Sequence, residues 1–391
     1  MQSVDSDLPL NSNQDFLVGK AGSPYTVETI VSEAALSDLE TAWNRLSEAA
    51  TAPNVFTTFG WFRAWYKRLA QDSSGRLRPH VLVLKRGNEV TGICPLVLWR
   101  RSRCGFVVRE LRFVTEHADY NDLILSADQV GMTRAVAEYL AQTANEWDVA
   151  NLGELRDQGE GSASLESALV HARLPYQALK RNTRCPYMPI DGTWSEMATK
   201  RHLYFARRAF AKFSASIPEG FGLRIVENPQ REPGLLDRMI SLEAQKHVGG
   251  ELTLPFLGKY QDVFQSLFDT LGPSGWIAVV VVEWNNCLVA WRFLYRCGTR
   301  LWYYLSAYDH SLSKLSLGTI SICAAIDYGY AHGFEELDFL RGEESYKLRW
   351  TSLFHENYRL MIWNRRWISR ARKWIYWDFR AGILQMIGKQ A

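Results

Sequence analysis

The same order of predicted elements occurs twice along the chain, and this duplication restricts the possible folds more than any other feature. Each half contains a strand, two helices, an antiparallel meander, a helix and a further strand. The first strand and meander are predicted at residues 25–31 and 80–114, with one meander strand at 90–98. Their counterparts are predicted at residues 223–226 and 276–306, and a final strand at 358–363. The pattern therefore predicts an α+β unit that is used twice.

Length and composition agree with two globular units. The chain has 391 residues, of which 47% are apolar and 22% are charged, and such a length favours two domains. We expect a disordered leader at 1–24, an N-terminal domain at 25–191, a C-terminal domain at 192–364 and a tail helix at 365–391. Each predicted domain is long enough to bury its own core.

Charge and cysteine usage exclude several classes of function. The net charge is only +3, so the chain as a whole is not a DNA-binding protein. Its six cysteines form no C-x-x-C pair and no cluster with metal-ligand spacing. The N-terminus does not look like a secretory signal, and the longest apolar run, 276–282, is too short to span a membrane. We expect a cytoplasmic protein with reduced cysteines, no metal and no DNA partner.

The most specific segment runs from Tyr308 to Trp350. Its polar loop opens into a predicted helix, where free backbone N–H groups and the helix dipole favour a phosphate. Lys314, Ser316 and Thr319 are placed for such a contact. An ordinary helix cap at Ser316 or Thr319 explains the same pattern.

This segment resembles the GNAT acyltransferase superfamily, in particular its duplicated branch of Fem-type peptidyltransferases and acetyltransferase-like proteins of cellulose or exopolysaccharide biosynthesis. The resemblance rests on SKLSLGT and DFLRGEESYKLRW. Weaker similarities are FGWFRAWY, HADYNDLIL, TKRHLYFARRAFAKF and SLEAQK. It implies two tandem GNAT-like domains, each with a mixed, mainly antiparallel sheet flanked by helices.

The resemblance also implies an acyl-CoA donor, most simply acetyl-CoA. The residues it assigns to the donor pyrophosphate are Lys314, Ser316, Leu317, Gly318 and Thr319. The usual family pattern is Gln or Arg followed by x-x-Gly-x-Gly or x-x-Gly-x-Ala. This loop departs from that pattern, because it has a single glycine. Fem-type relatives take an aminoacyl group from charged tRNA, so tRNA is the donor under that alternative.

Acyl transfer needs a base for the attacking group and a proton donor for the leaving group. We predict Glu243 or Asp309 as the base and the Tyr346 phenol as the donor, with Lys246 near the substrate. Ordinary structural roles explain each of them: Glu243 and Lys246 as a surface pair, Asp309 as a turn residue, and Tyr346 as a packing residue.

Two further groups are predicted to contact the acceptor. The charged turn after the strand at 336–340 offers guanidinium and ammonium groups that can bind the phosphate of a nucleotide sugar or lipid-linked sugar. Side chains after the first meander can bind sugar hydroxyls. Both groups also have a structural explanation. The cations of the charged turn can be neutralised by Glu343 and Glu344, and the side chains after the first meander can form Asx turns. The predicted acceptor residues are Arg341, Lys347, Arg349, Asp119, Tyr120 and Asp122.

Two basic segments remain. A helix is predicted at 194–213, and its residues 199–212 contain Lys, Arg and His without an acid. Such a stretch can bind a phosphorylated partner or tRNA, or can simply form a solvated helix face. In the tail, tryptophans fall on one side of a helical wheel and cations on the other. The tail is therefore predicted to lie on an anionic membrane surface, which would make the protein peripheral at the inner membrane, or to cap the second domain.

Together these observations predict an acyltransferase. It would move an acyl group from acyl-CoA to an amine or hydroxyl of a cell-envelope or exopolysaccharide precursor, by direct attack of the acceptor. The alternatives are a Fem-like aminoacyl-tRNA-dependent peptidyltransferase and a non-catalytic accessory protein of a polysaccharide synthase.

Overall fold

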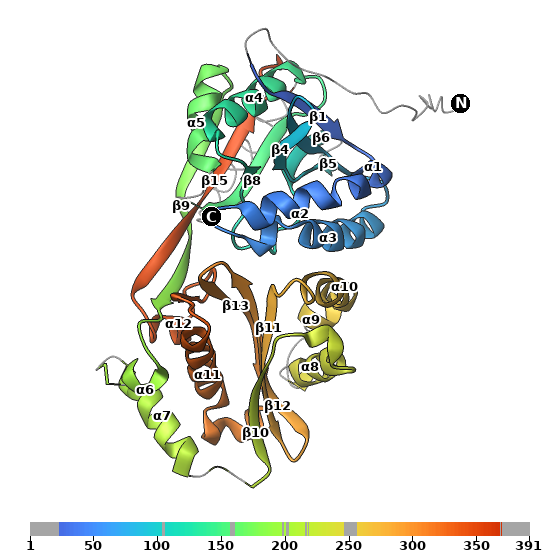
Figure 1. Ribbon diagram of the computed structural model, residues 1–391. Helices are drawn as coiled ribbons and strands as arrows, with labels where there is room; N and C mark the ends of the chain where they lie inside the picture. Colours follow the sequence, from blue (N-terminus) through green and yellow to red (C-terminus); the bar gives the residue numbers. More distant parts are fainter. Residues whose placement is uncertain are drawn as a thin grey trace, which may run out of the picture.

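The computed structural model describes residues 23–103, 106–156, 161–197, 199–200, 203–215, 217, 219–245, 256–367 and 369. These residues form two lobes of strands and helices, stacked one on the other (Figure 1). The α+β class is therefore confirmed. Most of the predicted leader and of the predicted tail helix lies outside the described residues.

The first lobe begins with a strand and capped helices. Ser32 and Thr58 accept the Ala35 and Trp61 backbone N–H groups, and so fix the starts of α1 and α3. In chain order the elements are β1 (Thr26–Ile30), α1 (Glu33–Asp38), α2 (Glu40–Ala49), η1 (Val55–Thr57), α3 (Phe59–Asp72), β2 (Leu77–Pro79), β3 (Val81–Arg86), β4 (Glu89–Cys94), β5 (Leu96–Arg103), β6 (Phe106–Phe113), β7 (Ile124–Leu125), α4 (Gln129–Gln142), β8 (Val149–Arg156), α5 (Ser162–His171) and β9 (Tyr176–Pro189).

One strand of the predicted meander is divided in two. The hairpin of β3 and β4 forms as expected around Gly87, which has a φ of +61°. The expected strand 90–98, however, breaks at Pro95, because proline has no N–H group for a β-ladder. As a result β4 and β5 belong to different sheets.

The second lobe repeats the order of strand, helices, meander, helix and strand. In chain order its elements are α6 (Trp194–Met197), α7 (Tyr204–Ala215), β10 (Phe221–Val226), η3 (Pro229–Arg231), α8 (Leu235–Ala244), α9 (Phe256–Lys259), α10 (Gln261–Leu271), β11 (Ile277–Trp284), β12 (Cys287–Cys297), β13 (Arg300–Tyr308), η5 (His310–Leu315), α11 (Leu317–Ala331), β14 (Glu336–Asp338), α12 (Ser345–Leu348) and β15 (Leu353–Trp363).

Two predictions in this lobe need correction. The single helix expected at 194–213 is two helices, α6 and α7. Trp194 and Leu203 are nine residues apart, which places them on opposite sides of one continuous helix, yet both are buried in the same core. The break allows both side chains to reach it. The strand expected at 336–340 is also shorter, because Leu340 adopts a left-handed φ of +58°.

The two lobes share one sheet. Its eleven strands follow the order β10-β11-β12-β13-β14-β9-β15-β8-β6-β5-β2, and a second sheet has the order β1-β3-β4-β7. Strand β9, from the first half of the sequence, pairs with β14, while β15, from the second half, pairs with β8 and β9. The last strand of each half thus crosses into the other lobe (Figure 1), and the sheet continues through the predicted boundary at residue 191.

An aromatic cluster also joins the lobes. Phe56 stacks on Trp302 with ring centroids 5.3 Å apart, and Trp61 meets the Tyr295 ring edge-on at 6.1 Å. Helix α3, which carries Trp61, packs along α10 of the second lobe. The aromatic helix is therefore buried between the lobes rather than being a surface element of the first one, and it fixes their relative position.

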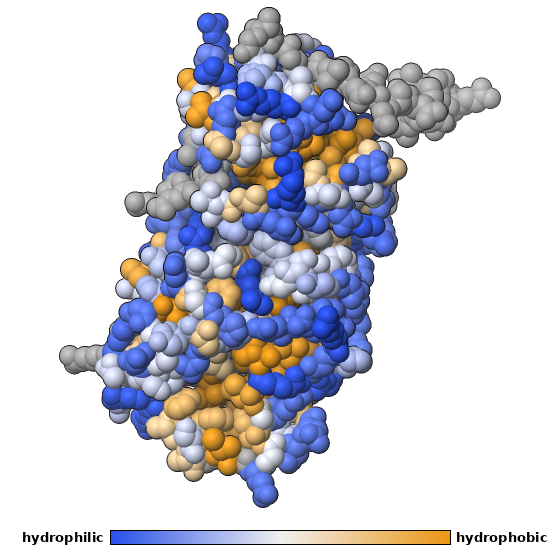
Figure 2. Space-filling model, in the orientation of Figure 1, coloured by the Kyte–Doolittle hydropathy of each residue, from blue (hydrophilic) through white to orange (hydrophobic). Residues whose placement is uncertain are grey.

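The face of the molecule that Figure 2 shows is mostly hydrophilic. Figure 2 shows apolar side chains gathered in patches over both lobes, separated by hydrophilic ones. Within the part of the chain that the structure describes, no helix combines the length and apolar character needed to cross a membrane.

Candidate active site

A cavity of about 970 Å³ lies where the two lobes meet. The second lobe supplies most of its wall, from β13, the start of α11 and the turn that contains α12. The first lobe contributes His117 and Asp119, from the segment after β6. A volume of this size is typical of a site for a small-molecule or cofactor-sized ligand.

The start of α11 forms one wall of this cavity. Ser316 precedes the helix in a left-handed conformation, with φ 57° and ψ 39°, and its side chain does not cap the helix. Among the described residues, the N–H groups of Leu317 and Gly318 have no acceptor, whereas that of Thr319 donates to the Ser316 carbonyl at 2.9 Å. Two free donors at the positive end of a helix can bind an anion.

Most of the predicted donor-binding residues reach the cavity. Ser316, Leu317, Gly318 and Thr319 all line it. The exposed side chain of Lys314 is not part of the cavity wall; it lies in η5, the short helix that replaces the predicted polar loop. This part of the cavity wall therefore offers backbone groups rather than a lysine side chain.

The charged turn after β14 forms the opposite part of the wall. Arg341 forms an ion pair with Asp119 of the first lobe, with Nε and Oδ1 2.6 Å apart. The buried Lys347 ammonium donates to the Arg341 carbonyl at 2.7 Å and lies 2.9 Å from the Glu344 carboxylate. The guanidinium of Arg349 stacks on Phe205 at 4.2 Å. All three predicted cations line the cavity, and Lys347 also stabilises the turn itself.

Asp119 has unusual electrostatics. Burial raises its pKa to about 7, although the nearby Arg341 and Lys347 charges oppose that shift. Burial, followed by the Arg341 charge, lowers the pKa of His117 to about 4. At neutral pH the cavity wall therefore has a neutral imidazole and a carboxylate that gains or loses its proton in the physiological range.

Two residues of the wall, Arg292 and Tyr303, were not predicted from the sequence. Both line the cavity, and the guanidinium carbon of Arg292 lies 3.9 Å from the centroid of the Tyr303 ring. A detectable signal was present in the sequence, because Arg292 is a charged residue inside the apolar run CLVAWRFLYRC. Charged residues are rarely buried without a partner or a function.

Several predicted residues lie elsewhere. The buried Glu243 carboxylate accepts the Leu257 N–H at 2.9 Å, and the Asp309 carboxylate accepts the Ser311 N–H at 2.8 Å. Neither lines the cavity. The Tyr120 hydroxyl donates to Asp338 at 2.6 Å. Tyr120 and Asp122 line a separate cavity of about 100 Å³.

The two remaining predicted residues are Tyr346 and Lys246. Tyr346 lines the main cavity and is 39% exposed. Lys246 lies outside the described residues. The structure therefore brings together the predicted backbone donors, Tyr346, Asp119 and the three cations of the charged turn, but not the two carboxylates predicted as bases.

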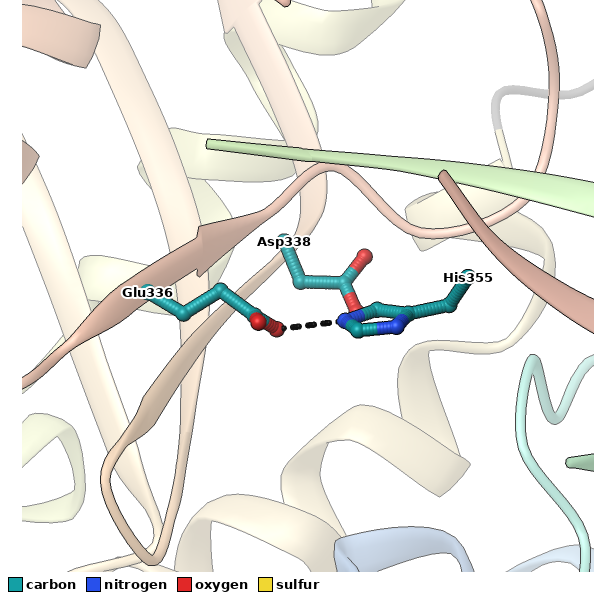
Figure 3. Close-up of side chains that lie close together, drawn as sticks. All are labelled: Glu336, Asp338 and His355. Atoms are coloured by element: carbon teal, nitrogen blue, oxygen red, sulfur yellow. Dashed lines mark hydrogen bonds and ion pairs between the residues drawn. The ribbon is translucent and has the colours of Figure 1, made fainter. Parts of the chain in front are cut away.

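A cluster of potential metal ligands lies apart from the cavity, on strands that flank β9. Glu336, Asp338 and His355 point toward one another (Figure 3), with ligand atoms within 4.8 Å. His355 Nε2 is 2.9 Å from Glu336, and Arg300 approaches the same carboxylate at 3.6 Å. Tyr120 and the Leu340 N–H donate to the two oxygens of the Asp338 carboxylate. These contacts explain the arrangement as a hydrogen-bonded cluster.

Comparison with known proteins agrees with the two-lobed fold. Residues 200–348 match the family model of the acetyltransferase (GNAT) domain. No curated protein sequence matches the chain.

Solved structures with a similar fold include three that match nearly their entire length. FemX is 11% identical, with a TM-score of 0.57 over 86% of this chain and 98% of its own. A conserved protein of unknown function from Bacteroides thetaiotaomicron is 12% identical, with a TM-score of 0.56 and coverages of 86% and 99%. The C-terminal domain of a putative lysylphosphatidylglycerol synthetase from Agrobacterium fabrum is 12% identical, with a TM-score of 0.53 and coverages of 89% and 97%.

The duplicated lobes and the open helix start define a protein with a tandem GNAT-type transferase fold. Residues 200–348 match the GNAT acetyltransferase domain, and the chain as a whole has a fold similar to those of FemX and of the lysylphosphatidylglycerol synthetase C-terminal domain. The predicted resemblance and the predicted tandem fold are therefore confirmed.

Proposed function

We propose that the protein is an acyltransferase that moves an acyl group from acyl-CoA, most simply acetyl-CoA, to an amine or hydroxyl of a cell-envelope or exopolysaccharide precursor. The observation that carries this proposal is the open start of α11 on the cavity wall. The Leu317 and Gly318 N–H groups would bind the donor pyrophosphate, while Ser316 and Thr319 would line its path.

The acceptor would enter from the side where the lobes meet. Asp119, ionised and paired with Arg341, would accept a hydrogen bond from the attacking amine or hydroxyl and orient it. The Arg341 and Arg349 guanidinium groups would attract a phosphate on the acceptor. Lys347 would support this contact by holding the turn in place.

The reaction would be a direct transfer. The nitrogen or oxygen of the acceptor bonds to the acyl carbon, the bond to the thioester sulfur breaks, and the Tyr346 hydroxyl supplies a proton to the departing thiolate. The proton that the acceptor loses restores the Tyr346 hydroxyl. Neither Glu243 nor Asp309 is assigned a role, because their carboxylates are engaged away from the cavity.

A second donor, aminoacyl-tRNA, is favoured by one observation. Helix α7 contributes Phe205 to the cavity wall and carries exposed cations at Arg207, Arg208 and Lys212. A basic surface adjoining a site can bind a nucleic-acid backbone. The name of the lysylphosphatidylglycerol synthetase relative is compatible with an aminoacyl group as cargo.

Titration calorimetry with acetyl-CoA and with a charged tRNA distinguishes these proposals. If acyl-CoA is the donor, the wild type should bind acetyl-CoA, and the double variant Arg207→Ala, Arg208→Ala should bind it with the same affinity. Transfer from tRNA predicts the converse: tRNA binding that falls in this variant and weakens steeply with salt. Failure of both donors to bind would contradict both proposals and favour an accessory protein.

Membrane contact through residues 365–391 remains a proposal from the sequence, since almost all of this segment lies outside the described residues. Trp367, at its beginning, is 77% exposed. Each cation near an anionic surface contributes about 1 kcal/mol. Co-sedimentation with phosphatidylglycerol vesicles, compared between the full chain and one ending at residue 364, tests the proposal.

A further inference from the structure

Two tyrosines and a serine form a hydrogen-bonded group on the cavity wall. Tyr303 and Ser306 come from β13 and Tyr346 from α12 (Figure 1). The Tyr303 hydroxyl lies 2.5 Å from the Ser306 hydroxyl, and the Tyr346 hydroxyl donates to the Tyr303 oxygen at 3.3 Å. Tyr303, the central member, is 7% exposed and therefore meets the cavity with only a small part of its surface.

An irregularity in the sheet places this group. Arg292 pairs with Ser306, but Leu294 pairs with Tyr303, so β13 contains one additional residue at this point. The bulge therefore lets Tyr303 and Ser306, three residues apart, face the same side as Arg292. A regular strand would place residues three apart on opposite faces.

Arg292 is the buried cation beside this group. It is 2% exposed, and its Nη2 donates to the Gly318 carbonyl at 2.9 Å and to Ser321 at 3.0 Å. Its Nη1 has no hydrogen-bond partner, and no carboxylate among the described residues forms an ion pair with it. A buried cation without a counter-ion is costly. The group that can supply the negative charge is the Tyr303 phenol, whose ring lies against the guanidinium at 3.9 Å.

We propose that Tyr303 is a catalytic residue, whose phenolate takes the proton of the attacking amine or hydroxyl, and that Arg292 is the positioning residue that holds the ring and balances its charge. The proposal deepens the proposed transferase function and rests on it. It separates the two phenols: Tyr303 accepts a proton, and Tyr346 gives one to the leaving group.

The proton balance closes within the hydrogen-bonded group. As the acceptor atom bonds to the acyl carbon and the bond to sulfur breaks, the acceptor proton moves to the Tyr303 oxygen. Tyr346 loses its proton to the departing thiolate and regains one from Tyr303 along the hydrogen bond that joins them. Both side chains return to their starting states, and the net change is one proton moved from the acceptor to the leaving group.

The surroundings of the two phenols favour a deprotonated Tyr303 and a protonated Tyr346. Burial alone would raise the pKa of Tyr303, but the Arg292 charge and the hydrogen bonds with Ser306 and Tyr346 outweigh it, so the pKa lies below its usual value. Burial, followed by the charge of Tyr303, raises the pKa of Tyr346. Glu344, which precedes α12, and Lys347, which follows Tyr346, are charged residues of the same wall, while Phe339, which follows β14, offers only an apolar ring.

An absorbance titration of tyrosinate tests this inference without any substrate. The expected result for the wild-type chain is one phenol that ionises at lower pH than the rest. This first transition should disappear in Tyr303→Phe and persist in Tyr346→Phe. It should move to higher pH in Arg292→Met, while Arg292→Lys should keep most of it. Circular dichroism identifies any variant that fails to fold, and Tyr303→Phe removes only one oxygen.

A first transition that persists unchanged in Tyr303→Phe would overturn the proposal. The kinetic test uses acetyl-CoA and an amine acceptor. General acid–base catalysis contributes about 10²–10⁴-fold, so Tyr303→Phe should lower kcat by that factor with an unchanged KM for acetyl-CoA, and Arg292→Lys should shift the pH–rate profile. Absence of acetyl-CoA turnover in the wild type would contradict the proposed function, while the titration result would still decide the state of Tyr303.

Discussion

The two lobes place a helix at equivalent points of the fold but give its start opposite chemistry. Helix α4 lies between β6 and β8 in the sequence, and α11 lies between β13 and β14; each of these strand pairs is parallel. At the start of α4, the Asp128 carboxylate accepts the Gly131 N–H at 3.0 Å and the Tyr25 hydroxyl at 2.8 Å. At the start of α11, Ser316 provides no side-chain cap.

This difference shows that the two copies of a duplicated fold can use an equivalent helix start differently. Both helices offer the same free N–H groups and the same dipole. In the first lobe the Asp128 carboxylate satisfies one of these groups, the Gly131 N–H, whereas in the second lobe the Leu317 and Gly318 N–H groups remain open to a cavity. The first lobe instead contributes a carboxylate to that cavity, Asp119. One residue at the helix cap therefore distinguishes a capped helix start from one that is open to a cavity.

The largest expected effect concerns the two aspartates of the first lobe, whose pKa values shift in opposite directions. Burial raises the pKa of Asp119 from 3.8 to about 7, so the folded state binds a proton more tightly than the unfolded state. Its contribution to stability is therefore present at low pH and lost as pH rises from about 4 to about 7. At about 1.4 kcal/mol per pKa unit, the loss is on the order of a few kcal/mol.

Urea unfolding at about pH 4.5 and about pH 8 measures this contribution. Asp119→Asn should gain stability relative to the wild type as pH rises. Asp128→Asn is the matched control with the opposite sign: the Gly131 N–H, followed by the Tyr25 hydroxyl, lowers the pKa of Asp128, so the stability that this carboxylate provides is lost as pH falls. Parallel profiles for the wild type and Asp119→Asn would contradict the assignment.

The next effect comes from giving α11 the cap of α4. Ser316→Asp would place a carboxylate where the donor phosphate is proposed to bind, and the like charges should weaken acetyl-CoA binding about 10- to 100-fold, or roughly 1–3 kcal/mol. Ser316→Asn is the matched neutral control, because asparagine has the same shape and tolerates the left-handed backbone. Stability should not fall, since an acid at a helix start is favourable. Equal acetyl-CoA affinity in both variants would move the phosphate away from α11.

The sequence predicted the features that depend on local pattern. The start of α11, the charged turn and the order of elements follow from periodicity and from a family resemblance, and both the helix start and the turn line the cavity. The features that failed depend on distant contacts. Glu243 is occupied by the Leu257 N–H, 14 residues away, and no helical pattern reveals this. The bulge that turns Tyr303 and Ser306 to one side requires knowledge of the strand register.

The crossing strands were unpredictable for a similar reason. The sequence correctly indicates that 358–363 is a strand, but its partner could be any exposed strand edge. Pairing of β15 with β8 joins segments about two hundred residues apart, and only the assembled lobes make that edge available. The role of Asp119 follows from this arrangement, since Arg341 reaches it across the junction of the lobes.

The smallest effect is expected at the closed helix start itself. Asp128→Ala removes the side-chain acceptor of the Gly131 N–H and the partner of the Tyr25 hydroxyl, and loss of such a cap costs about 1 kcal/mol. Asp128→Asn keeps an acceptor and should cost less. Because α4 lies in the lobe without the open helix start, acetyl-CoA affinity should be unchanged in both variants. Thermal and urea unfolding measure the first quantity and calorimetry the second. A loss of acetyl-CoA affinity in Asp128→Ala, with little change in stability, would contradict this prediction. It would show that the start of α4 also contributes to acetyl-CoA binding, and that the two lobes differ less than their helix caps indicate.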